Sequence, residues 1–108
     1  MITVDTTTLA DIINQCFAFS ADGRFSDDQQ GDFLADGKRL RGLLLNLISA
    51  QFNDGTQSVL DANIKLTEVN KQLDKDAVVL ANATQALNNV ANLVGTLDKL
   101  LNVAASFL

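Results

Sequence analysis

Apolar residues near the start of the chain recur with the spacing of an amphipathic helix. They lie at i, i+3, i+4 and i+7 and so share one face of a helix. These positions are Leu9, Ile12, Ile13 and Cys16. Asp5, or one of the threonines at 6–8, can accept hydrogen bonds from the first N–H groups of such a helix. The pattern predicts a helix over residues 6–19.

A second helical pattern follows Ser26. Ser26 and Gln29 stand at the spacing of a capping box, and the apolar positions after them alternate by four and three residues. These positions are Phe33, Gly37, Leu40, Leu44 and Leu47. The pattern predicts a helix over residues 27–52. Its end, LLLNLISAQF, is apolar around most of its circumference, so we expect it to be buried on more than one side.

A heptad pattern dominates the rest of the chain. The stretch NDGT at 53–56 is typical of a tight turn, and a short connection makes the helices on either side antiparallel neighbours. With Val59 as position a, positions a and d stay apolar to the C-terminus except at Asp76. A seven-residue period sustained this long favours coiled-coil-like packing. It predicts one helix over residues 56–107, a rod of roughly 75 Å at 1.5 Å per residue.

The apolar stripe of this predicted rod widens along its second half. The g positions begin as Ser58, Lys65 and Gln72 and then become apolar. A wide stripe needs two neighbours, yet the helix over 27–52 reaches only the first half. Two arrangements could cover the second half: the helix over 6–19 could lie along it, or further chains could pack there. We expect both to contribute.

We therefore predict self-association through the C-terminal helix. The charged seam residue Asp76 either marks a local water-filled gap or pairs with a basic residue of a neighbour and fixes the register. The predicted contact residues are Val79, Leu87, Val90, Leu93, Val94, Leu97, Leu100, Leu101 and Phe107. The predicted fold is a single all-α domain over residues 1–108, in which two shorter helices pack antiparallel on one long C-terminal helix.

Composition narrows the function classes. The 108 residues contain no Pro, which suits long helices, and carry a net charge of −5, which disfavours nucleic acid and simple docking on anionic lipid. With no His and one Cys, the chain cannot form a Ser-His-Asp triad or an intrachain disulfide. We interpret Cys16 as a small core residue and expect no enzymatic activity, no metal and no cofactor.

The stretch ADGRFSDDQQ, residues 21–30, resembles part of a calcium-binding EF-hand loop. With Gly23 at position six of that loop, position one is Ala18 and position twelve is Gln29. The first and last carboxylate ligands of calcium are then missing. We interpret the stretch as a turn between two helices, with Phe25 pointing inward.

Two charged runs occupy the helix over 27–52. Asp28, Asp32 and Asp36 repeat every four residues, a spacing at which like charges repel. They could form a solvated face, in which Asp36 pairs with Arg39. The alternative is a cation site or an acid/base site. The run GKRLRG at 37–42 could rest on a lipid interface. We interpret both runs as exposed polar faces.

Residues 77–97 carry no charge. Their length is enough to cross a bilayer, but Asn, Gln and Thr occupy the positions off the seam. We predict a non-catalytic helical interaction or structural module whose partner is itself or another helical protein. The alternative is a membrane-active protein, of the secreted pore-forming kind, whose uncharged C-terminal half inserts into lipid. The chain begins with no signal-peptide pattern, so the cytoplasm is the default location, and export by a signal-less route would leave no mark in the sequence.

Overall fold

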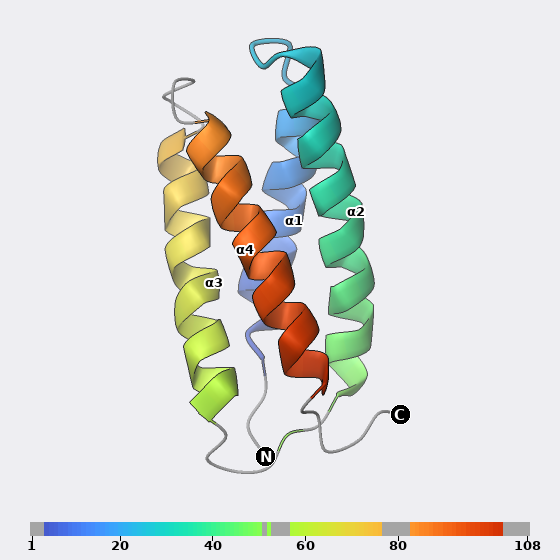
Figure 1. Cartoon of the computed structure of the whole chain (residues 1–108), viewed down its shortest axis with the longest axis vertical. Helices are drawn as coiled ribbons and strands as arrows, with labels where there is room; N and C mark the ends of the chain where they lie inside the picture. The colour runs from blue at the N-terminus through green and yellow to red at the C-terminus, as the bar shows by residue number, and fades with distance from the viewer. Residues whose placement is uncertain (1–3, 51, 53–56, 77–82, 103–108) are drawn as a thin grey trace.

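The computed structural model describes residues 4–50, 52, 57–76 and 83–102, which form four helices and no strand (Figure 1). The helices are α1 (Thr6–Ser20), α2 (Asp27–Ser49), α3 (Gln57–Asp76) and α4 (Ala83–Asn102). The all-α prediction is confirmed, and the first two helices lie where their apolar spacing predicts them. The second ends at Ser49, a little earlier than expected.

The prediction of one long helix over 56–107 is wrong. α3 ends at Asp76, α4 begins at Ala83, and the two run side by side in opposite directions (Figure 1). The molecule measures 43 × 21 × 18 Å, which leaves no room for a 75 Å rod. Folding back lets each half of the heptad seam cover the other, so the chain itself supplies the neighbours that the wide stripe requires. The predicted turn at 53–56 lies outside the described residues.

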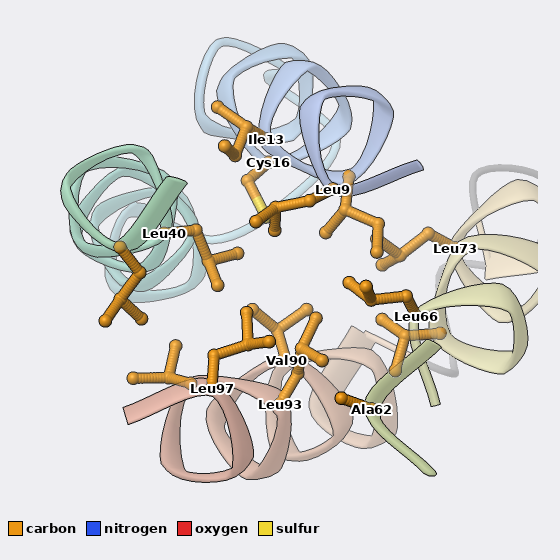
Figure 2. Close-up of a cluster of buried hydrophobic side chains, with 14 of the residues drawn as sticks. Leu9, Ile13, Cys16, Leu40, Ala62, Leu66, Leu73, Val90, Leu93 and Leu97 are labelled. Atoms are coloured by element: carbon orange, nitrogen blue, oxygen red, sulfur yellow. The ribbon is translucent and has the colours of Figure 1, made fainter. Parts of the chain in front are cut away.

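Each helix contacts two others. α1 packs against α2 and α3, and α4 packs against the same two helices from the other side of the core. Figure 2 shows this arrangement along the bundle, with α2 and α3 at diagonal corners. α1 and α3 run in one direction, and α2 and α4 run in the other (Figure 1). The prediction that the first two helices pack antiparallel on the C-terminal region is therefore wrong, because the pairs in contact, α1 with α3 and α2 with α4, each run in the same direction (Figure 1).

The core is made of apolar side chains from all four helices (Figure 2). Its fully enclosed members include Leu9, Leu40, Leu66, Val90 and Leu97. Burying side chains of this size stabilises the bundle by about 1.5–3 kcal/mol each.

Local signals place the helix ends. The Asp5 carboxylate accepts hydrogen bonds from the Thr8 backbone N–H at 3.1 Å and from the Thr8 hydroxyl at 2.7 Å, and so caps α1. The Asp5 backbone N–H donates to the side-chain oxygen of Asn63 at 2.8 Å, which ties the start of α1 to α3. At α2, the capping box of Ser26 and Gln29 is formed as predicted.

α1 and α2 approach closely at Gly37. A methyl group at this position would lie 2.9 Å from Cε1 of Phe17 and 3.3 Å from Cβ of Cys16. Only glycine therefore fits here without displacing a neighbour. This contact fixes the height of α2 against α1.

Candidate functional site

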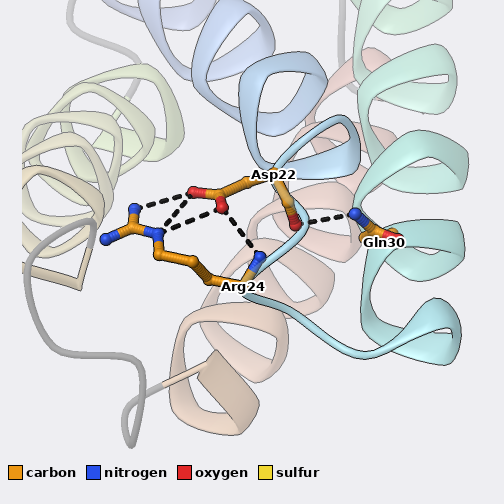
Figure 3. Close-up of polar contacts among 3 residues, drawn as sticks. All are labelled: Asp22, Arg24 and Gln30. Atoms are coloured by element: carbon orange, nitrogen blue, oxygen red, sulfur yellow. Dashed lines mark hydrogen bonds and ion pairs between the residues drawn. The ribbon is translucent and has the colours of Figure 1, made fainter.

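The stretch that resembles an EF-hand loop is a helix–helix connection (Figure 3). Both carboxylate oxygens of Asp22 are held by Arg24, whose Nη2 donates to Oδ2 at 2.7 Å and whose Nε donates to Oδ1 at 3.1 Å. The side-chain amide of Gln30 donates to the Asp22 carbonyl at 2.6 Å. These hydrogen bonds with Arg24 lower the pKa of Asp22. The turn interpretation is confirmed, and Phe25 is buried as predicted.

Cys16 lies in the core, as the sequence predicts. Burial raises the pKa of its thiol to about 12, and the negative charge of Asp36 contributes in the same direction. The thiol is therefore protonated at neutral pH and enclosed by apolar side chains. It has neither the charge nor the access that a nucleophile requires.

In the described ranges, no three acidic or thiol side chains converge as a metal site would require. A shallow groove of about 500 Å³ between α1 and α3 is lined by polar residues, including Asp11, Asp74 and Asn70. Asn70 accepts a hydrogen bond from the Gln15 amide at 2.7 Å, so its side-chain oxygen is already engaged in joining the two helices. The groove is therefore a water-exposed boundary between two packed helices.

The acidic run of α2 borders a groove that we call the α2–α4 groove. The groove holds about 250 Å³. Its lining residues are Asp32, Ala35 and Asp36 from α2, and Leu87, Asn88 and Ala91 from α4. Asp28 and Asp32 are exposed, as a solvated face predicts, but Asp36 is half-buried. The groove therefore combines three small or half-buried apolar side chains, Ala35, Leu87 and Ala91, with two carboxylates one helical turn apart.

The environment of Asp36 disfavours its negative charge. Burial raises its pKa, the Asp32 carboxylate raises it further, and Arg39 partly offsets both. Burial and Asp32 together outweigh Arg39, so folding favours the protonated form of Asp36.

Replacing Asp36 with Asn is expected to stabilise the chain at pH 7 by a few tenths of a kcal/mol, because it removes a half-buried charge that burial and the Asp32 carboxylate both disfavour. Since the pKa of Asp36 is raised by folding, its protonated form is favoured in the fold. The stability that protonated Asp36 contributes is fully present below the ordinary pKa of a carboxyl group. It is lost as pH rises through the raised pKa of the folded state. The gain in melting temperature, about 1–3 °C, should therefore shrink as pH falls. A gain that grows toward acid pH in circular-dichroism melts would contradict the raised pKa.

A second feature of α2 faces the other way, on the side of α1. Residues spaced by four and three positions form what we call the α2 stripe: Leu34, Lys38, Arg41, Leu45 and Ile48. The guanidinium carbon of Arg41 lies 5.9 Å from the centroid of the Phe17 ring of α1, which locates the stripe beside α1. Leu45 and Ile48 are 66% and 65% exposed.

This exposure overturns the expectation that residues 43–52 are buried on more than one side. Leu43, Leu47, Ala50 and Phe52 are buried, but Leu45 and Ile48 point into solvent. The stripe was not predicted, because Leu45 and Ile48 were both assigned to the core. The signal was present, however, in the continuous four–three spacing from Leu34 onward.

The predicted self-association residues are mostly inside the bundle. Val90, Leu93, Val94, Leu97 and Leu100 are buried among the other helices of the same chain. Leu87 and Leu101 are half-buried, and Leu87 lines the α2–α4 groove. Val79 and Phe107 lie outside the described residues, and Asp76 is the last residue of α3. Association through the buried residues would require the bundle to open, and it stays a prediction.

Comparison with models of protein families, with curated proteins and with solved structures gave no match.

Proposed function

We propose that this protein is a non-catalytic helical interaction module that associates with itself. The α2 stripe is the observation that carries the proposal. Leu34, Leu45 and Ile48 are exposed on one face of α2, with Lys38 and Arg41 between them, while α1 and α4 cover the buried side of the helix. Exposed apolar residues on one face of a helix are what a partner helix recognises.

The chemistry of the described residues agrees with this class of function. The thiol is buried and protonated, and the carboxylates of Asp32 and Asp36 stand in a shallow groove without a histidine, which the chain lacks altogether. A second form of the proposal is that the partner is another helical protein and not a second copy of this chain.

The molar mass in solution tests self-association. As concentration rises, light scattering should give a mass that increases above the 11.6 kDa of one chain. Replacing Leu45 and Ile48 together with Gln should keep the mass near that of one chain without lowering the melting temperature, since both side chains are exposed.

The matched control is the pair Leu60→Gln and Ile64→Gln on α3. These residues are 44% and 57% exposed but lie outside the α2 stripe, so this variant should associate like the wild type. A wild-type mass of one chain at all concentrations would reject self-association. An equal loss in both variants would reject the stripe as its surface.

The membrane-active alternative retains one observation in its favour, the absence of charge over residues 77–97. Over the described part of the chain, no helix is both long and apolar enough to cross a bilayer. In α4 the apolar face is turned toward the core. Dye release from liposomes over a range of pH and lipid composition separates this alternative from the proposal, which expects none.

A further inference from the structure

The two outward features of α2 are complementary to each other in charge. Residues 27–36 contain four Asp and no basic residue, whereas residues 37–49 contain two Arg and one Lys and no acidic residue. The structure turns Asp32 and Asp36 toward α4, into the α2–α4 groove, and turns Lys38 and Arg41 outward in the α2 stripe. Lys38 and Arg41 lie on the opposite side of α2 from the groove of their own chain, so within one chain only part of the charge of Asp36 is offset, by Arg39.

We propose that the α2 stripe of one chain lies in the α2–α4 groove of a second copy of the chain. The inference rests on the proposed self-association and identifies the two surfaces that meet.

The spacing of the groups supports this pairing. Asp32 and Asp36 are separated by one turn of α2, as are Lys38 and Arg41, so two basic groups can face two carboxylates at once. Leu45 follows Arg41 by one further turn. It can then contact the apolar lining residues of the groove, Ala35, Leu87 and Ala91.

Electrostatics favours this arrangement over the symmetric one. If the stripe met a copy of itself, Lys38 and Arg41 of both chains would be brought together, and like charges across an interface oppose association. In the groove the same groups meet the carboxylates of Asp32 and Asp36, which repel each other across one turn of α2. A basic partner relieves that repulsion.

The arrangement also leaves both features of each chain usable. One chain can offer its stripe to a second chain while its groove receives the stripe of a third. Such unlike surfaces produce a ring or an open chain of subunits rather than only a symmetric dimer.

Two variants, each with one surface disabled, test the inference. The groove variant carries Asp32→Lys and Asp36→Asn, and the stripe variant carries Lys38→Glu and Leu45→Gln. At a concentration where the wild type associates, light scattering should give each variant alone the 11.6 kDa mass of one chain. An equimolar mixture should give twice that mass, because the groove variant keeps an intact stripe and the stripe variant keeps an intact groove.

The control variant changes a similar pair of exposed residues on α3, Ile64→Gln and Glu68→Lys, and should associate like the wild type. Circular-dichroism melts check that every variant is folded. If a double variant is not folded, the single changes Asp32→Asn and Leu45→Gln are used, and each should reduce association several-fold.

The possible results separate the two proposals. A wild type that stays at the mass of one chain rejects both self-association and the pairing. A wild type that associates while the groove variant also does so, or a mixture of folded variants that stays at the mass of one chain, rejects the pairing alone. A mixture that doubles in mass supports both.

Discussion

Shortening Leu93 to alanine will destabilise the single chain by about 2–5 kcal/mol, because it leaves a cavity in the core. Leu93 is fully buried in α4, between the helices of its own chain (Figure 2). The loss is a large fraction of the about 5–15 kcal/mol that holds a domain of ordinary stability together. Urea denaturation followed by circular dichroism measures it. The loss should be the same at low and at high protein concentration, because no second chain contributes to this contact.

Leu45→Ala is the matched comparison for this prediction. The same side chain is shortened, but Leu45 is 66% exposed, so the free energy of unfolding should stay within about 0.5 kcal/mol of the wild type. Self-association should weaken instead. The opposite pattern, in which Leu93→Ala lowers only the mass in solution and leaves the unfolding curve unchanged, would show that the apolar face of α4 contacts another chain.

This contrast marks the part of the fold that the sequence could not decide. A heptad pattern indicates only that one side of a helix packs against another helix. The pattern is the same whether that helix belongs to another chain or to a later part of the same chain. Residues 77–82 contain neither Gly nor Pro, the strongest helix-breaking residues, and the only local sign of a new helix is Asn82, a residue type that also occurs within helices. Asp76, interpreted as a gap or a register residue of the seam, instead stands at the end of α3.

The features that were predictable have local causes. The caps at Asp5 and Ser26 and the inward position of Phe25 depend on neighbours within a few residues, so the sequence alone contains the required information. The apolar spacing of α1 and α2 also needs no knowledge of the rest of the fold.

The candidate site was only half predictable. Its charges were visible, but the acidic and basic runs of α2 were interpreted separately as solvated faces. Whether either run borders a groove depends on which helix stands beside α2. Only the fold places Leu87 and Ala91 of α4 next to Asp32 and Asp36. The relation between the two surfaces is therefore a property of the tertiary structure.

The other large effect is expected at Phe33. Its ring is fully buried and contacts two further rings edge-on or tilted, with centroid distances of 5.0 Å to Phe19 and 5.4 Å to Phe25. Phe33→Ala should lower the free energy of unfolding by about 3–5 kcal/mol through the cavity it leaves, including the loss of the aromatic contacts. Thermal and urea denaturation measure this loss.

Leu34→Ala, one position later on the outer side of α2, provides the control, because Leu34 is 38% exposed. It should change stability far less than Phe33→Ala. Similar losses in the two variants would mean that α2 is rotated from the orientation described here. In that case the α2 stripe and the α2–α4 groove would not lie on opposite sides of the helix, and the proposed pairing of chains would lose its geometric basis. Stability measurements at these two adjacent residues thus test the orientation on which the functional proposal depends.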